Sequence, residues 1–282
     1  MIVNGNKRMD LANYSVLMSV YYKEKAEFLR LAMDSIWNQT VPTNDFVLVC
    51  DGPLTPELDK AIEKMQQTHP ELHVVRLEKN SGLGNALNIG IKHCKNELVA
   101  RMDSDDISHP DRCEKQLIIF RDNPELSICS GTVQEFTDST EKIEAERTLP
   151  ENQEKILEFA KKRNPFNHPC VMYKKQAVEA AGGYQVFSLL EDYYLWIRML
   201  QNGVIGYNIQ EPLIWMRAGS AMYKRRGGWK YIKSQIALFG YMKESGFIDS
   251  GQFVKSAALR MASAAAPNFL REFMFKSFLR QK

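Results

Sequence analysis

Arg101-Met102-Asp103-Ser104-Asp105-Asp106 is the stretch that decides how this chain folds. The apolar residues 98–100 lead into it, so the pattern predicts a buried strand that ends abruptly in acid. Three closely spaced carboxylates repel one another, and a Mg²⁺ or Mn²⁺ ion, which prefers oxygen ligands, would relieve that repulsion. The alternative is a solvated turn whose Asp side chains cap a helix that begins near Pro110. An EF-hand is excluded, because its spaced ligands, central Gly and closing Glu are missing.

Around this turn, short apolar runs alternate with segments of helical periodicity. The predicted strands are 14–22, 46–50, 73–77 and 97–102, and the predicted helices are 23–39, 56–67 and 80–94. Such alternation is typical of an α/β fold with a doubly wound, mixed but mainly parallel sheet that is flanked by helices.

The remainder of the chain continues this pattern and then becomes helical. The predicted helices are 110–121, 151–162, 176–181, 189–199, 229–245 and 251–264, the predicted strands are 126–136, 171–173, 204–209 and 213–217, and 140–150 is a predicted surface loop. We therefore predict an α/β domain over 1–217, followed by a basic helical C-terminal extension over 218–282.

Polar and aromatic side chains follow the predicted parallel strands. They are Tyr21 and Tyr22, Asp51, Asn80 to Gly84, and Asp103 to Asp106. Because the carboxyl ends of parallel strands meet at one edge of a sheet, these loops are expected to line one crevice. A tyrosine there could stack on a base, Asp51 could bond a base or ribose, and glycines at a helix start could admit phosphate. A core tyrosine and ordinary turns are the alternatives.

Two later segments also carry candidate residues. His168 lies in a rigid Asn-Pro-Phe-Asn-His-Pro loop, where it is either a structural side chain or a contact to acceptor or phosphate. Glu191 and Asp192 open an otherwise apolar helix. They either cap that helix or supply a general base beside a metal and a substrate hydroxyl.

Composition limits the classes of protein. The five cysteines are scattered without a CxxC pair, which favours reduced core residues over disulfides or a zinc site. The polar N-terminus has no signal-peptide core, and no apolar run is long enough to span a bilayer. Residues 216–282 hold 13 Lys and Arg against 3 Asp and Glu, whereas the remainder holds 24 against 31. This basic end indicates an anionic partner.

Two parts of that basic end are candidate contacts. Lys224, Arg225 and Arg226 stand beside glycines, as in a solvated loop or a clamp on a diphosphate. The aromatic and basic residues 269–280 either lie on an anionic membrane surface or pack on the body as a closing helix.

The chain resembles glycosyltransferase family 2, the inverting transferases of the GT-A fold, and within it bacterial enzymes of capsule, O-antigen and exopolysaccharide synthesis. The resemblance rests on the order of five segments over residues 14–217. They are SVLMSVYY (15–22), VLVCDGP (47–53), NSGLGNALNIGI (80–91), ARMDSDD (100–106) and LLEDYYLWIRM (189–199). Asn167-His168-Pro169 also fits that subgroup, whereas the Gln-x-x-Arg-Trp motif of processive synthases is absent.

The resemblance implies a role for each matched residue. Tyr21 would stack near uracil, Asp51 would bond its edge, and Asp103 would contact the ribose or the metal. Asp105 would ligate the metal at the diphosphate. Asp192 would be the catalytic base, with Glu191 positioning the acceptor. The expected donor site is completed by Tyr22, which stands where many members have Asn, and by Asn80, Gly82, Arg101, Lys224 and Arg225.

The resemblance also implies the reaction and its setting. A hydroxyl of a saccharide, such as a polyprenyl-diphosphate-linked glycan, would attack a UDP-sugar with Mn²⁺ or Mg²⁺ present, and configuration would invert. UDP-galactose, UDP-glucose and UDP-N-acetylglucosamine are the expected donors. The enzyme would act in the cytoplasm, peripherally on the inner face of the plasma membrane, and no nucleic acid is an expected partner.

Three other hypotheses are weaker. A sugar-nucleotide pyrophosphorylase would need a Gly- and Arg-rich phosphate loop near the N-terminus, which is missing. An inactive nucleotide-sugar-binding protein would not need both Asp105 and Asp192. Nucleic-acid binding through the basic end would need aromatics arrayed as a stacking platform, and those present look packed.

Overall fold

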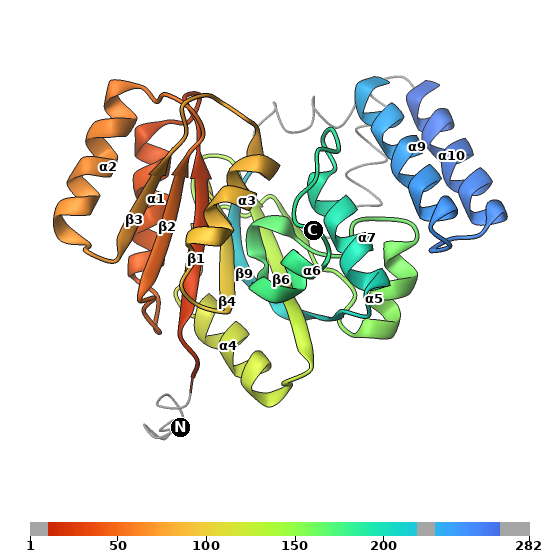
Figure 1. The fold of residues 1–282 in the computed structure, drawn as a ribbon, viewed down its shortest axis with the longest axis horizontal. Coiled ribbons are helices and arrows are strands. Elements are labelled where there is room, and N and C mark those ends of the chain that lie inside the picture. Colours follow the sequence, from red (N-terminus) through yellow and green to blue (C-terminus); the bar gives the residue numbers. More distant parts are fainter. Residues whose placement is uncertain (1–10, 219–228, 266–282) are drawn as a thin grey trace.

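The computed structural model describes residues 11–218 and 229–265, with side chains to residue 261. Helices flank a central mixed sheet, and two further helices lie at one end of the molecule (Figure 1). The strands are β1 (Tyr14–Val20), β2 (Asp45–Cys50), β3 (Leu72–Arg76), β4 (Leu98–Asp103), β5 (Ile107–Ser108), β6 (Leu126–Phe136), β7 (Ala145–Arg147), β8 (Met172–Lys174) and β9 (Ile205–Arg217).

The helices follow the predicted alternation. They are α1 (Ala26–Trp37), α2 (Pro56–Thr68), α3 (Leu83–His93), α4 (Arg112–Asp122), α5 (Gln153–Ala160), α6 (Lys175–Ala180), α7 (Glu191–Gln201), α9 (Trp229–Glu244) and α10 (Ser250–Ala265), with a 3₁₀ turn, η2 (His168–Cys170). The predicted fold class, a mainly parallel α/β sheet with a helical C-terminal extension, is confirmed.

The strand order is β3-β2-β1-β4-β8-β6-β9-β5, and β7 pairs with β6. Strands β1 to β4 pair in parallel, whereas β8 runs antiparallel to both β4 and β6. Ser19 of β1 is in register with Asp103 of β4, so the loops after these strands emerge side by side. The acidic turn therefore lies at the carboxyl edge of the parallel half.

Two buried clusters cover the two faces of the sheet. Helices α1, α2 and α4 pack on one face, and α3, α5, α6, α7 and α9 contribute to the cluster on the other. Along β1, Val16 and Met18 face the first cluster and Leu17 faces the second, as expected for a central strand covered on both sides. Helix α3 approaches the sheet closely at Gly90, where a Cβ would lie 2.4 Å from Leu17 Cδ1.

Two details of the predicted strands are wrong. The predicted loop 140–150 contains β7, which pairs with the outer half of β6. Its three residues, Ala-Glu-Arg, carry no apolar alternation that could have indicated a strand. The predicted pair of strands 204–209 and 213–217 is one strand, β9, with a bulge at residues 210–211 where its register against β6 shifts. That bulge accommodates Pro212 inside the strand.

The five cysteines are buried and free, which confirms the prediction of reduced core residues. None of the helices within the described ranges is long and apolar enough to cross a membrane. Helix α9 contributes Leu238, Phe239 and Met242 to the same cluster as α7, so this first helix of the extension packs on the body. The boundary at residue 217 stays a prediction.

Candidate active site

The loop after β2 is tied to the start of α3. The Asp51 carboxylate accepts hydrogen bonds from the backbone N–H of Ser81 (2.7 Å) and of Gly82 (3.0 Å). Asn80 donates to the Asp51 carbonyl over 3.1 Å. Gly82 has φ 88°, a left-handed conformation that favours glycine, and it begins the helix. Asp51, Asn80 and Gly82, predicted as one donor-binding group, are therefore in contact with one another.

Tyr21 and Tyr22 follow β1 at this edge. Their rings meet edge to face with centroids 5.8 Å apart, and both are exposed, 39% and 50% respectively. The alternative of a core tyrosine is thereby excluded for Tyr21. The Asp51 N–H donates to the carbonyl of Val20, the residue before Tyr21, over 2.8 Å, and an exposed aromatic ring is suited to stack on a base.

In the acidic turn, Arg101 and Asp103 form a bidentate ion pair. Arg101 Nη1 donates to Asp103 Oδ2 over 2.8 Å, and Nη2 donates to Oδ1. The Arg101 side chain is fully buried beneath the turn, so it acts on Asp103 instead of reaching a ligand directly. The sequence predicted that Arg101 contacts the donor. In the structure its side chain instead pairs with Asp103, another predicted donor contact. Bidentate pairing fixes the orientation of the Asp103 carboxylate.

The other two carboxylates of the turn, Asp105 and Asp106, lie close to further negative charges. Burial, together with the charges of Asp103 and Glu24, raises the pKa of Asp105 to about 7. Burial and the neighbouring Asp105 also raise the pKa of Asp106 well above its usual range. Asp106 Oδ1 accepts a 2.8 Å hydrogen bond from the backbone N–H of Arg217, which fastens the turn to the end of β9.

The turn fits a cation that is shared with a diphosphate. Within residues 11–218 and 229–261, no cluster of three or more His, Cys, Asp or Glu side chains could hold a metal alone. Mg²⁺, however, is commonly held by one or two carboxylates with substrate phosphates completing its shell. Asp103 and Asp105 would be the two carboxylates, and a cation there would offset the burial and the repulsion that raise the pKa of Asp105.

Helix α7 carries Glu191 and Asp192 in its first turn. Asn164 Nδ2 donates to Asp192 Oδ2 over 2.7 Å, which fixes the carboxylate. Burial, and then the adjacent Asp192, raise the pKa of Glu191. Both acidic residues lie in the first turn of α7, where negative charge stabilises a helix, so the helix-capping alternative and the general-base prediction both stand.

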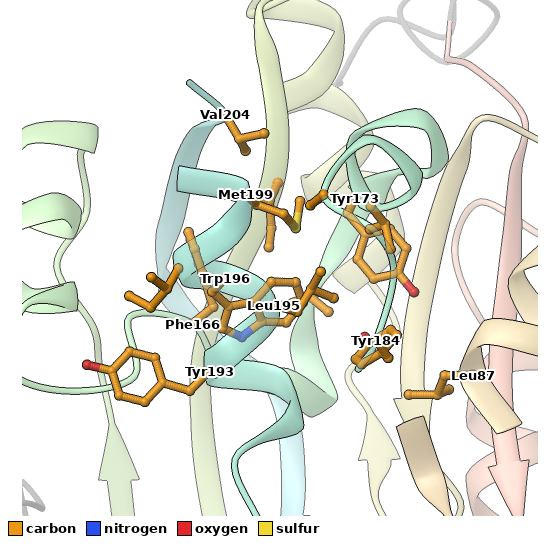
Figure 2. Packing of buried hydrophobic residues seen from close by; sticks show 14 of the residues in the cluster. Leu87, Phe166, Tyr173, Tyr184, Tyr193, Leu195, Trp196, Met199 and Val204 are labelled. Atoms are coloured by element: carbon orange, nitrogen blue, oxygen red, sulfur yellow. The ribbon is translucent and has the colours of Figure 1, made fainter. Parts of the chain in front are cut away.

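Helix α7 is anchored by Trp196. Its ring lies among Phe166, Tyr173 and Tyr184, and Figure 2 shows these side chains converging on α7 from several elements. Trp196 is fully buried, and the residues on either side of it are also buried. The first turn of α7 is thus held in place by the packing of its second.

The donor side and the acceptor side of the crevice meet at α3. A Cβ on Gly84 would lie 3.6 Å from Glu191 Cγ and 3.4 Å from Tyr184 Cβ. Asn88, one turn further along α3, donates to the Tyr184 carbonyl and accepts from the Tyr184 N–H over 2.7 Å. The start of α3 is therefore in contact with the start of α7.

His168 lies near α7, but its side chain is largely buried there. Its Nε2 lies 2.9 Å from the Tyr184 hydroxyl, and its ring contacts Trp196 edge-on. Burial, with a smaller effect of Arg101, lowers the pKa of His168 well below its usual range. The geometry supports the structural alternative for this residue, while a contact to acceptor or phosphate stays a prediction. Lys224, Arg225, Arg226 and residues 269–280 lie outside the described residues.

Sequence reasoning missed several residues that hold this site. Asn164 was noticed only as part of the rigid loop around His168, and a polar residue before Pro165 was the one available signal. Glu24, which accepts a 3.0 Å hydrogen bond from Ser104, had no motif to indicate it. Asn88 lies in the segment 80–91, but its contact with Tyr184 joins residues 96 positions apart, and no sequence pattern indicates it.

A comparison of the chain with protein-family profiles identifies one match, glycosyl transferase family 2, over residues 15–182. The chain belongs to glycosyltransferase family 2. All segments of the crevice up to Gly182 lie inside the matched range, including the acidic turn and Asn164, whereas Glu191 and Asp192 follow it.

Relatives of this family 2 chain include bacterial enzymes of surface polysaccharides. It is 41% identical over 238 residues to the amylovoran biosynthesis glycosyltransferase AmsE of Erwinia amylovora, covering 83% of this chain and 88% of that protein. It is 36% identical over 272 residues to an Escherichia coli UDP-Gal:alpha-D-GlcNAc-diphosphoundecaprenol beta-1,3-galactosyltransferase, covering 96% and 98%.

Solved structures of low identity share the fold of this family 2 chain. Staphylococcus aureus TarS 1–349 in complex with UDP-GlcNAc matches with a TM-score of 0.65 at 17% identity, covering 95% of this chain and 77% of TarS. The mannosyltransferase PcManGT of Pyrobaculum calidifontis, in complex with GDP-Man and Mn²⁺, matches with a TM-score of 0.60 at 16% identity, covering 96% and 83%. These likenesses confirm the GT-A type of fold.

Proposed function

We propose that this chain is an inverting, non-processive transferase that moves a hexose from a UDP-sugar to a hydroxyl of a polyprenyl-diphosphate-linked saccharide. The observation that carries the proposal is that the start of α3 contacts both Asp51 and Glu191. Gly82 donates to the Asp51 carboxylate, and a Cβ on Gly84 would lie 3.6 Å from Glu191 Cγ. A donor and an acceptor bound there would meet.

The donor side suits a nucleoside diphosphate. Tyr21 offers an exposed ring to a base, and the start of α3 at Gly82 offers backbone N–H groups to phosphate. Asp103 and Asp105 would hold Mn²⁺ or Mg²⁺, which would neutralise the charge that grows on the departing diphosphate. UDP-galactose is the first donor to test, because the Escherichia coli relative is named for it.

The acceptor side suits proton removal from a hydroxyl. Asn164 occupies one oxygen of the Asp192 carboxylate, so the other oxygen would take the proton as the hydroxyl attacks the anomeric carbon. Attack from the face opposite the departing UDP inverts the configuration, as in inverting glycosidases with a hydroxyl in place of water. Glu191, beside it, would position the acceptor.

The proposed place of this reaction is the cytoplasmic face of the inner membrane, in the synthesis of a surface polysaccharide. One relative named for amylovoran biosynthesis and another named for a diphosphoundecaprenol-linked acceptor support it. The basic C-terminal part, with 13 cations against 3 carboxylates over residues 216–282, supports a location beside anionic lipid.

The thermal stability of the purified protein tests the donor without any acceptor. A ligand that binds only the folded state at 100 times its Kd stabilises it by about 2.7 kcal/mol, which raises the Tm of a protein of this size by roughly 5 °C. We expect this rise with UDP-galactose, UDP-glucose or UDP-N-acetylglucosamine and Mn²⁺, and a smaller one with GDP-mannose. No response to any UDP-sugar would overturn the proposed donor class.

A further inference from the structure

A groove lies between the loop that precedes α7 and one face of α9. Val186, Phe187 and Ser188 line it on one side, and Lys233, Ser234 and Ala237 line it on the other. Its volume is about 370 Å³, and it is open to solvent. Figure 1 shows α9 next to the end of the molecule that carries α7. None of the donor-side residues takes part in lining this groove.

Exposed apolar residues lie in this groove and beside it in the sequence. Val186, which lines it, is 93% exposed, Trp229, one turn before Lys233 on α9, is 55% exposed, and Leu189, next to Ser188, is 39% exposed. Phe187 packs on Tyr194, which in turn packs on Tyr241, so the floor is fixed to α7 and α9. Exposed apolar side chains that gather around one groove indicate an apolar ligand.

The groove also carries positive charge close to the proposed base. Lys233 lines it, and Lys230, one turn earlier on α9, is near enough to Glu191 to lower the pKa of that carboxyl against the effect of burial. Ammonium groups beside an apolar surface are complementary to an amphiphile whose head is anionic. A diphosphate joined to a hydrocarbon has this chemistry.

A tight turn at Leu189 joins the groove to α7. Leu189 has φ 67°, and within the described ranges it is the one non-glycine residue with positive φ. A leucine in this conformation is strained, and such strain gathers at binding sites. The turn at Leu189 joins the groove wall directly to Glu191 and Asp192. Ser188 precedes Asp192 by four residues, a separation of at most about 14 Å.

We propose that this groove binds the diphosphate and the first isoprene units of a polyprenyl-diphosphate-linked acceptor, which extends the proposed function to its lipid carrier. Lys230 and Lys233 contact the diphosphate, and Val186, Leu189 and Trp229 contact the isoprene chain. The sugar attached to that diphosphate then extends past Leu189 toward Asp192. The lipid carrier is thereby recognised separately from the sugar.

Farnesyl diphosphate, which has the head and three isoprene units but no sugar, is the probe. Its binding is measured by calorimetry on the full chain with UDP present and without divalent metal, so that diphosphate does not enter the donor side. We expect farnesol and inorganic diphosphate each to bind at least tenfold more weakly. A Lys230→Glu, Lys233→Glu double variant should bind farnesyl diphosphate at least tenfold more weakly, and a Val186→Asp variant should also bind it more weakly.

The matched control is Lys255→Glu, which reverses an exposed lysine on α10 and should bind farnesyl diphosphate as the parent does. The proposed lipid site would be overturned if the double variant bound farnesyl diphosphate as well as the parent does, or if the control lost as much binding as the double variant. Phosphatidylglycerol vesicles that compete as well as farnesyl diphosphate would indicate a general anionic-lipid surface and would also overturn it. Stabilisation by UDP-sugar, measured on every variant, shows separately whether the transferase proposal stands.

Discussion

Asn164 donates a 2.7 Å hydrogen bond to Asp192, and this bond fixes one oxygen of the carboxylate that opens α7. The Asn164 carbonyl is itself held by Arg147, and Asn164 Oδ1 accepts from the Phe166 N–H. Asn164, whose side chain orients Asp192, is thus itself held in place by hydrogen bonds from Arg147 and Phe166. A carboxylate with one oxygen fixed and the other free is well placed to take a proton in one defined direction.

We expect Asn164→Ala to lower kcat by about 10- to 100-fold, because a hydrogen bond to a charged group contributes about 1.5–3 kcal/mol. The KM for the UDP-sugar should stay the same, since Asn164 is on the acceptor side. Steady-state kinetics measure both constants. The matched control is Asn202→Ala, at the exposed far end of α7. A raised donor KM with an unchanged kcat would contradict a positioning role.

Asp192→Asn should remove transfer while preserving donor binding. The amide keeps the shape of the carboxylate but cannot accept the proton, and loss of a general base costs about 10²- to 10⁴-fold. Transfer assays measure the loss, and the rise in Tm with UDP-sugar measures donor binding. Equal loss of both would assign Asp192 to the donor or to folding.

Asp105→Ala should abolish the part of nucleotide binding that depends on Mn²⁺. The variant keeps Asp103 and its ion pair with Arg101, so the turn should remain folded. Calorimetric titration of UDP with and without Mn²⁺ measures the effect. Asp111→Ala, which removes an exposed carboxylate just beyond the turn, is the control. A variant that keeps its Mn²⁺ dependence would place the metal elsewhere.

The buried ring of His168 predicts a pH dependence of stability. Its pKa is lowered in the folded protein, so below about pH 6.5 the unfolded chain takes up a proton that the folded protein does not. Stability is therefore retained above that pH and falls as the pH drops, by up to about 1.4 kcal/mol per pH unit. Urea unfolding from pH 7.5 to pH 5 should give a shallower slope for His168→Gln. Replacing the exposed His93 in the same way should leave the slope unchanged.

Gly90 sets how closely α3 can approach the sheet. A Cβ there would lie 2.4 Å from Leu17 Cδ1 and 2.6 Å from Val49 Cγ2. Gly90→Ala should therefore lower the free energy of unfolding by about 1–2 kcal/mol, although alanine favours a helix. Gly240→Ala in α9 should instead raise it by up to about 1 kcal/mol, because an added Cβ there would meet no described atom within 4 Å outside its own stretch of helix. Urea unfolding compares the two, and an unchanged Gly90→Ala variant would show that α3 can shift.

The sequence predicted correctly those parts of the fold that a pattern of neighbouring residues specifies. The buried strands β1, β2 and β4 are short apolar runs, and the acidic turn lies next to one of them. The strand β7 could not be predicted, because its pairing with β6 supplies what its own three residues lack. Arg101 was expected at the donor, but only packing reveals that it lies buried beneath Asp103. Asn164 and Asn88 act through partners distant in sequence, which no spacing indicates.

The two hydrogen bonds between Asn88 and the main chain of Tyr184 have a consequence for turnover. They join α3, which begins beside Asp51, to the segment that leads into α7, which carries Glu191 and Asp192. Under the proposed function, a shift of the donor side along this seam would therefore carry the acceptor side with it. Binding of one substrate would then change the position at which the other is held.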